Sequence, residues 1–400
     1  MRRVAITGLG VVSSIGIGVD AFHESLRAGR SGAGPINAFD TTGFAHATGC
    51  EVSGFEPCRW VRRVPMAQVS RAGQFAIASA RMAIADAGLT ETGLTGSRGV
   101  ISVGTTDGGS DDGERVAEAF TRSGPDAIDP DAACRVAAGR LATGVARELQ
   151  LSNVEVSTIA TACAAGNYAI GNGFDAVRTG EADFALCGGA DAMCRMTFTG
   201  FYRLGAIDPR HCRPFDSDRR GILTGEGAAM LLLEPLEAAL ARGARSYGEI
   251  LGYGLNCDAR HQVAPDGESV RRCMELALLD ANVTPGEVDF VSAHGTGTKA
   301  NDVTECGAMH ELFGPRMPRT ISVKSMLGHT MGAAGALAAA ACALALEHGF
   351  IPPTINHERT DPECAIDCVP NRAVPGEPRV VLNNGLAFGG NNATVVIGKR

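Results

Sequence analysis

The chain has 400 residues, 45% of them hydrophobic, so it can bury a large core as two domains or one duplicated unit. Its net charge of −8 argues against non-specific binding to nucleic acid or to an anionic membrane, since both need a basic surface. Thirteen cysteines without a repeated CxxC spacing indicate reduced thiols and a cytoplasmic protein rather than a disulfide framework.

The N-terminal sequence MRRVAITGLGVV predicts a first β-strand. Glycines interrupt its short apolar run and no small-residue cleavage site follows, so it lacks the features of a signal peptide. The 52 glycines are spread over the whole chain, which indicates turns and close backbone contacts rather than a linker.

Two pairs of segments echo each other along the chain. The predicted helix MAIADAGL (82–89) resembles LALLDANV (276–283), and each leads through a polar turn into a predicted strand. Gly88 and Asn282 match at the helix ends, because both residue types tolerate left-handed geometry. VEVSTIATACAAGNYAIGNGFDAV likewise resembles TISVKSMLGHTMGAAGALAAAACAL. We therefore predict two similar α/β halves, 1–245 and 246–400, stacked as a five-layer αβαβα sandwich.

Cys163 lies in TACAAGN, between the strand VEVSTIA and a helix of small residues. The positive end of the helix dipole should lower the thiol pKa and stabilise a nucleophilic thiolate. The alternative is a buried structural cysteine, which most of the other twelve must be.

Two histidines and a lysine stand out in the C-terminal half. His294, in SAHGTGTKAND, follows the strand VDFVSA at the end where open α/β sheets place their ligands. His329, in VKSMLGHTMGAAG, precedes an alanine-rich helix at the place that the second echo pairs with Cys163, and the helix dipole favours its neutral ring. Lys324 has apolar neighbours that favour an inward-facing ammonium. The alternatives are core histidines and a solvated lysine.

The stretch 331–346 is uncharged and mostly alanine, and it is shorter than the roughly 20 residues of a membrane span, so we interpret it as a buried helix. Cys364 and Cys368 form the closest cysteine pair. No second pair lies near enough to complete four ligands, so no metal site is expected.

The C-terminal sequence NNGLAFGGNNATVVIG places Phe388 between a strand and two glycines. A phenylalanine in this flexible setting suits a moving gate, and its backbone N–H is able to face an oxyanion. The alternative is an ordinary β-turn.

Together these motifs resemble the β-ketoacyl-acyl-carrier-protein synthases of the elongating class, in the thiolase superfamily. The resemblance covers essentially the whole chain. It rests on five motifs in the family's order, which are TACAAG, RPFDSDRRGILTGEGAAMLLLE, AHGTGTKAND, VKSMLGHTMGAAG and AFGGNNA. It implies a thiolase-like fold and either a homodimer or a heterodimer with a subunit that resembles a chain-length factor.

The resemblance also implies a decarboxylating Claisen condensation in fatty-acid or polyketide synthesis. Cys163 would carry the acyl group delivered by an acyl carrier protein. Neutral Nε2–H donors of His294 and His329 would stabilise the enolate formed from malonyl-acyl carrier protein. The backbone N–H groups of Cys163 and Phe388 would hold the tetrahedral oxyanion.

By the same resemblance, Lys324 orients the histidines and Glu305 ties the active-site loops together. No metal or redox cofactor is required, because the substrates are carried on the phosphopantetheine of the carrier protein. Ala387 stands where the family more often has glycine, which would stiffen the gate.

The loop 104–114, with Asp107 and Gly108, is glycine-rich and acidic where bulkier apolar residues usually line the acyl pocket. This departure from the family favours longer, stiffer or more polar acyl chains, as in polyketide or polyene synthesis.

A basic segment without Asp or Glu runs from Cys58 to Ala85. It suits the docking of an acidic acyl carrier protein that is steered by Coulomb attraction. The alternative is that its arginines are solvated or paired within a dimer. Its arginines are Arg59, Arg62, Arg63, Arg71 and Arg81. Arg203, in GFYRLG, is a further docking candidate by resemblance.

Two other functions stay open. A non-catalytic subunit of the chain-length-factor type would lack the nucleophile, whereas Cys163, His294 and His329 are all present. A thiolase-type acyltransferase acting on coenzyme A would need a second catalytic cysteine, and Cys342 and the pair at 364 and 368 are poorly placed for that role.

Overall fold

The computed structural model describes residues 1–399, through which one long mixed sheet runs. Its strands lie in the order β12-β11-β15-β16-β10-β1-β9-β7-β5-β6, with β2 beside β1. The N-terminal set comprises β1 (Val4–Ser13), β2 (Gly16–Ile17), β5 (Gly99–Gly104), β6 (Val154–Ile159), β7 (Phe184–Asp191) and β9 (Gly227–Pro235). The C-terminal set comprises β10 (Gly248–Cys257), β11 (Phe290–Ser292), β12 (Arg319–Ile321), β15 (Val380–Leu386) and β16 (Asn391–Gly398).

The two sets repeat the same strand directions. β5 is parallel to β6 and β7, and β9 is antiparallel to β7 and β1. In the same way β11 is parallel to β12 and β15, and β16 is antiparallel to β15 and β10. The sets meet where β1 pairs with the start of β10. The predicted duplication is confirmed, while the boundary at residue 245 stays a prediction.

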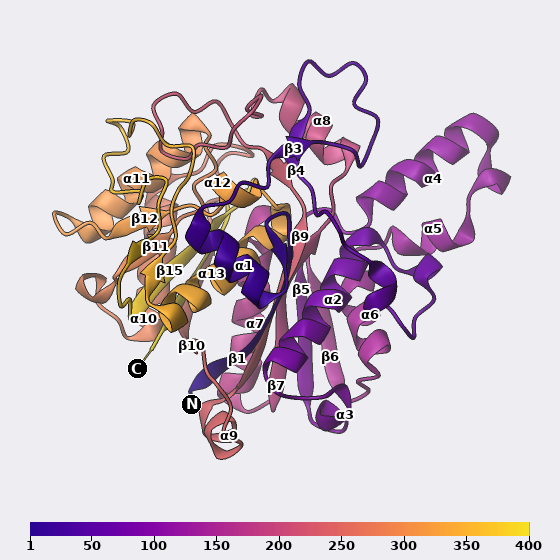
Figure 1. Ribbon diagram of the computed structural model, residues 1–400, viewed down its shortest axis with the longest axis horizontal. Helices are drawn as coiled ribbons and strands as arrows, with labels where there is room; N and C mark the ends of the chain where they lie inside the picture. Colours follow the sequence, from indigo (N-terminus) through magenta and orange to yellow (C-terminus); the bar gives the residue numbers. More distant parts are fainter. Residues whose placement is uncertain (400) are drawn as a thin grey trace.

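Helices form three layers around the strands (Figure 1). The outer layers are α2 (Arg71–Asp86) with α6 (Arg140–Leu149), and α10 (Gly267–Ala281) with α11 (Lys299–Phe313). The central layer is α7 (Ala165–Thr179) with α13 (Ala334–His348), and both helices contact strands of the two sets. The five-layer αβαβα arrangement is therefore confirmed.

The remaining helices and strands connect these layers. The helices are α1 (Val19–Ala28), α3 (Glu91–Leu94), α4 (Ser110–Ser123), α5 (Pro130–Arg135), α8 (Arg195–Arg203), α9 (Leu236–Ala241) and α12 (Lys324–Leu327). The short strands are β3 (Gly34–Pro35), β4 (Thr48–Cys50), β8 (Thr224–Gly225), β13 (Phe350–Ile351) and β14 (Val374–Pro375). Figure 1 shows α4 and α5 projecting from the body of the protein.

The first pair of similar segments, 82–89 and 276–283, makes the same contact in both halves. Asp86, at the end of α2, accepts the backbone N–H of Leu9 in β1 at 2.8 Å. Asp280, near the end of α10, accepts that of Tyr253 in β10 at 3.1 Å. Each carboxylate ties an outer helix to the equivalent strand of its own half. Left-handed residues follow both helices as predicted, namely Gly88 (φ 70°) and Asn282 (φ 50°).

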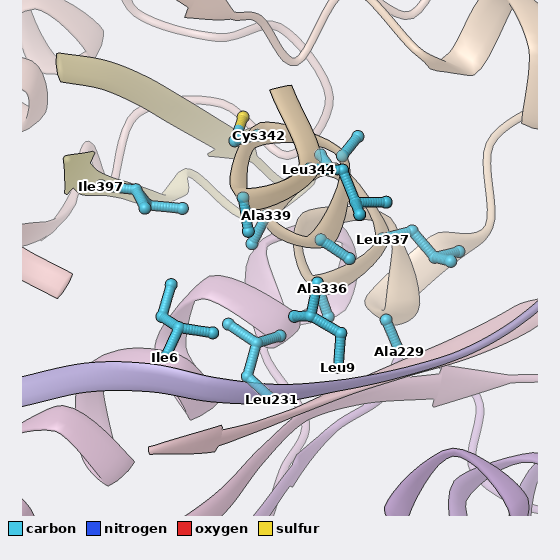
Figure 2. Packing of buried hydrophobic residues seen from close by; sticks show 14 of the residues in the cluster. Ile6, Leu9, Ala229, Leu231, Ala336, Leu337, Ala339, Cys342, Leu344 and Ile397 are labelled. Carbon is cyan, nitrogen blue, oxygen red and sulfur yellow. The ribbon is translucent and has the colours of Figure 1, made fainter. Parts of the chain in front are cut away.

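Helix α13 is buried along almost its whole length, because its alanines let it pack closely between the strands. Figure 2 shows it above Leu9 and Leu231, with Ile397 of β16 nearby. In the described residues one helical stretch, Met331–His348, is long and apolar enough to cross a membrane, which the sequence did not lead us to expect. Since 89% of it is buried inside the protein, it has the surroundings of a core helix, as predicted.

Candidate active site

Cys163 lies in a one-turn 3-10 helix that leads directly into α7 and begins at Ala162 with a positive φ of 48°. The corresponding turn before α13 begins at Met331 with φ 50°. Aligning the two turns pairs Cys163 with Gly332. His329 lies before this turn, so the predicted pairing of His329 with Cys163 is wrong.

Cys163 lines a cavity of about 370 Å³ together with His294, His329 and Phe388. The exposed fractions of Cys163, His294 and His329 are 5%, 4% and 2%, whereas Phe388 is 36% exposed. The two imidazole rings lie 5.4 Å apart between centroids and nearly perpendicular, at 80°. The structure thus brings four predicted residues, distant in sequence, into one enclosed site.

His329 is held by its backbone and by its ring. Its N–H donates to the carbonyl of Leu223 at 2.6 Å, and its carbonyl accepts from Gly225 at 2.8 Å. The ring Nδ1 accepts the N–H of Met331 at 3.2 Å, which assigns the hydrogen of the neutral ring to Nε2. Burial and the charge of Lys324 hold the pKa of His329 well below its usual value. The residue is therefore a neutral Nε2–H donor.

His294 is backed by a buried lysine and a buried carboxylate. Lys324 Nζ lies 3.5 Å from His294 Nδ1. Glu305 accepts the backbone N–H groups of His294 at 2.8 Å and Gly295 at 2.9 Å, and the side-chain amide of Asn384 at 3.1 Å. Burial lowers the pKa of Lys324 and raises that of Glu305, while burial and the Lys324 charge hold the pKa of His294 well below its usual value.

Burial raises the pKa of the Cys163 thiol to about 12, although the charge of Lys324 acts in the opposite direction. The predicted lowering of this pKa is therefore wrong. A thiolate in the closed cavity loses its hydration, and this cost outweighs the nearby positive charge. Cys163 is thus a thiol at neutral pH and would have to lose its proton before its sulfur could act as a nucleophile.

We expect alkylation of Cys163 by iodoacetamide to accelerate continuously from about pH 6 to about pH 10. The physical reason is that the reactive thiolate fraction rises about tenfold per pH unit below the pKa. Mass spectrometry of the Cys163 peptide measures the rate, and the peptide of exposed Cys58 serves as the reference. A rate that levels off below pH 8 would contradict the raised pKa.

Phe388 lies in the loop that joins β15 to β16, with its ring centroid 5.4 Å from that of Phe201. Gly389 and Gly390 follow it, both at φ 82°. A Cβ on Gly390 would lie 2.1 Å from Asp258 Oδ1, so this position requires glycine. The sequence does not single out Phe201 as a neighbour of the gate, since it is one aromatic residue among several in α8.

Asp107 lines a second cavity, of about 10 Å³, between α8 and Met331, rather than the cavity of Cys163. Its carboxylate accepts the hydroxyl of Thr197 at 2.6 Å, and burial raises its pKa. Gly108 has φ 59°, and a Cβ there would lie 2.8 Å from that of Ala138. Asp107 and Gly108 thus shape a loop beside the site, and the contact with an acyl chain stays a prediction.

Asp191, the last residue of β7, was not singled out from the sequence. It is fully buried and accepts the Thr105 hydroxyl at 2.5 Å, the Thr106 N–H at 2.8 Å and the Gly332 N–H at 2.6 Å. Burial and the charge of Asp107 raise its pKa to about 7. Its position at the end of the buried strand FALCGGAD is the signal that would have revealed it.

The basic segment is partly neutralised inside the chain. Arg71 donates to the buried carboxylate of Glu226 at 2.6 Å and 2.9 Å, so it is the weakest of the docking candidates. Arg63 and Arg81 both pair with Glu91. Arg59 pairs with Glu56 but stays exposed, and Arg62 and Arg203 are exposed as well.

The cysteines and histidines outside the cavity show no arrangement for metal binding. In the described residues no group of three or more His, Cys, Asp or Glu side chains is placed to hold an ion. All thirteen cysteines, including Cys364 and Cys368, are free thiols.

Family models match both halves of the chain. "Beta-ketoacyl synthase, N-terminal domain" matches residues 1–239, and "Beta-ketoacyl synthase, C-terminal domain" matches residues 247–358. The 3-oxoacyl-[acyl-carrier-protein] synthase 2 of Synechocystis sp. (strain ATCC 27184 / PCC 6803 / Kazusa) is 37% identical over 409 residues, which cover 100% of this chain and 98% of that protein.

Two solved structures extend the comparison. "The ishigamide ketosynthase/chain length factor" superimposes with a TM-score of 0.98 at 59% identity, covering 100% of this chain and 99% of that one. A type II PKS acyl-carrier protein in complex with its ketosynthase bound to the hexaketide gives a TM-score of 0.91 at 31% identity, covering 100% and 99%.

Proposed function

The chain belongs to the β-ketoacyl synthase family, and we propose that Cys163 carries the acyl group that a malonyl unit extends. Its fold is thiolase-like, and its reaction is the decarboxylating condensation of fatty-acid or polyketide synthesis. The single observation that supports these residue roles is the cavity shared by Cys163, His294 and His329.

In the loading step, the sulfur of Cys163 attacks the thioester carbonyl of an acyl-carrier protein. A new C–S bond forms, and the phosphopantetheine sulfur leaves. Because Nε2 of His329 already carries a hydrogen and its Nδ1 accepts from Met331, this ring is not a ready base. The net result is transfer of the Cys163 proton to the departing thiolate.

In the condensation step, the bond between the malonyl carboxylate and its methylene carbon breaks and CO2 leaves. The electron pair forms an enolate, whose oxygen accepts from the Nε2–H groups of His294 and His329. Neutral rings suit this task, since they donate without supplying a proton to quench the carbanion. The enolate carbon attacks the Cys163 thioester, and the N–H groups of Cys163 and Phe388 hold the oxyanion. The Cys163 thiolate then leaves and takes up a proton from water, which restores the thiol.

We place the reaction in the cytoplasm and in polyketide synthesis, with a chain-length-factor-like subunit as partner. The support is the 59% identity to the ishigamide ketosynthase/chain length factor structure. Strand β6 is an open sheet edge on which Val156 is 36% exposed, and Phe120 on the projecting α4 is 55% exposed. Both features give a second subunit an edge and apolar surface to cover. The proposal needs no cofactor beyond the phosphopantetheine of the carrier protein.

This function is tested by incubating the purified complex of this chain and its partner subunit with acyl-carrier protein and malonyl-carrier protein. We expect a covalent acyl adduct on Cys163, release of CO2 and a product longer by one two-carbon unit. A chain that gives no adduct fits the non-catalytic alternative. An adduct from acyl-coenzyme A with none from the carrier protein fits the coenzyme A transferase.

We expect Arg62→Glu and Arg203→Glu each to raise the KM for acyl-carrier protein about tenfold at low salt with little change in kcat. The reason is that both side chains are exposed and Arg203 directly precedes Leu204 and Gly205, two exposed residues that line the cavity. Steady-state kinetics at low and high salt measure the effect, which should shrink as salt is added. Arg272→Glu on α10, an exposed arginine of the outer layer, is the matched control. An equal KM change in all three variants would contradict specific docking.

A further inference from the structure

Two buried asparagines join the elements that carry the nucleophile and the gate. Asn167 lies one helical turn after Cys163, and its amide nitrogen donates to the carbonyls of Asn383 in β15 at 3.0 Å and Ala393 in β16 at 3.1 Å. The Asn383 amide nitrogen donates in return to Asn167 Oδ1 at 2.9 Å, and to the carbonyl of Gly335 in α13 at 2.8 Å. Both side chains are fully buried, so water does not replace these bonds.

The packing around this amide pair leaves little room for movement. A Cβ on Gly335 would lie 2.6 Å from Asn167 Oδ1, and a Cβ on Gly385 would lie 3.3 Å from the Cα of Ala164. Helices α7 and α13 and the β15–β16 hairpin therefore meet at close range here. The two glycines permit the close packing of these helices and the hairpin, and the two amide side chains set their relative positions.

We propose that Asn167 and Asn383 are positioning residues that set the separation between the Cys163 and Phe388 backbone N–H groups. Asn167 lies in the first turn of α7, directly after the 3-10 turn that carries Cys163, and its hydrogen bonds hold both strands of the hairpin whose loop carries Phe388. The base of the hairpin is thereby fixed, while the glycines after Phe388 leave the loop free to move. This inference rests on the proposed function, in which these two N–H groups hold the acyl oxyanion.

The amide pair acts on acyl transfer rather than on decarboxylation, because the two histidines have separate supports. His329 is held by Leu223 and Gly225, and His294 is held through Glu305. None of these bonds involves the side chain of Asn167 or Asn383, and the nearest link is the amide of Asn384, the next residue in β15, which donates to Glu305. Loss of the pair should therefore separate the two half-reactions, which a general loss of stability would not do.

The test compares Asn167→Ala and Asn383→Ala with Asn172→Ala, on the same helix. Asn172 also donates from its amide, but to the hydroxyls of Ser102 and Ser157. Two rates are measured on the complete complex below the melting temperature, namely acyl loading of Cys163 and malonyl-carrier decarboxylation. We expect loading to fall about 10- to 100-fold in kcat in Asn167→Ala, and about threefold to tenfold in Asn383→Ala, which keeps the bonds from Asn167 to the two carbonyls. Decarboxylation should stay within about twofold of the parent in both. Asn172→Ala should leave both rates unchanged.

The inference is overturned if both rates fall together, or if Asn167→Ala and Asn383→Ala both load at the parent rate. A parent protein without an adduct on Cys163 would instead contradict the proposed function. If Asn167→Ala does not fold, Asn383→Ala decides alone, since it leaves the bonds from Asn167 to the two backbone carbonyls in place.

Asn167→Asp gives a separate readout. Its ionised carboxylate would face the carbonyls of Asn383 and Ala393, whereas the protonated acid donates to one of them again. The loading rate relative to the parent should therefore recover as the pH falls from about 8.5 to about 6. A ratio that does not change with pH would contradict a role for these hydrogen bonds.

Discussion

Replacement of Cys163 by alanine should abolish the acyl adduct and lower condensation at least about a thousandfold, because among the described residues that line the shared cavity Cys163 alone carries sulfur. The fold should persist, since the change removes one small buried group at a cost of about 1 kcal/mol. Mass spectrometry of the intact protein and thermal unfolding measure the two effects. Malonyl decarboxylation should continue in this variant, because His294 and His329 are unchanged.

The matched control is Cys342→Ala, which removes a buried thiol from α13. We expect this variant to keep the adduct on Cys163 and the condensation rate. If Cys342→Ala instead stopped condensation while Cys163 still loaded, a second catalytic cysteine of the thiolase type would replace the mechanism proposed above. An adduct that persisted in Cys163→Ala would also reject it.

His329→Ala should slow malonyl-carrier decarboxylation about 100- to 1,000-fold and acyl loading less than about tenfold. In the proposed function the Nε2–H of this ring is one of two donors to the enolate oxygen, and removal of one such donor typically has an effect of this size. The hydrogen bond from Met331 to Nδ1 fixes the ring orientation, so the donor is already in place before the substrate binds. Release of CO2 from malonyl-carrier protein measures the first rate and adduct formation the second.

His348→Ala is the control for this variant, because His348 lies exposed at the far end of α13. It should leave both rates unchanged. Decarboxylation at the parent rate in His329→Ala would remove this residue from the mechanism. A fall in loading as large as the fall in decarboxylation would show a general disturbance of the cavity rather than the loss of a donor.

The elements of the fold were predictable because their signals are local. Strand β1, the buried helix α13 and the duplicated helix ends each depend on a few neighbouring residues. The contacts of Asp86 and Asp280 then follow from the repeat, since equivalent side chains meet equivalent strands. The register of the second echo was misjudged, because alanine-rich helices look alike and the positive φ values of Ala162 and Met331 have no sequence signal.

The properties that were missed depend on partners far along the chain. The pKa of Cys163 reflects enclosure by the other half, which a helix terminus seen in isolation does not report. Arg71 meets Glu226, and Asn167 meets Asn383, which stand 155 and 216 positions apart. Such long-range pairs decide which polar side chains are internal and which face a partner.

The duplication also raises the question of why the chain has one reacting centre where its architecture provides two equivalent helix starts. At Cys163 the turn before the helix borders the cavity, whereas at Gly332 the backbone N–H is already bound to the carboxylate of Asp191. The carboxyl group of Asp191 thus occupies the backbone N–H of Gly332, which leaves this donor unavailable to an oxyanion. The two repeats have thus diverged, because the turn at Gly332 is occupied by a side chain from the other repeat, Asp191 at the end of β7 in the N-terminal half.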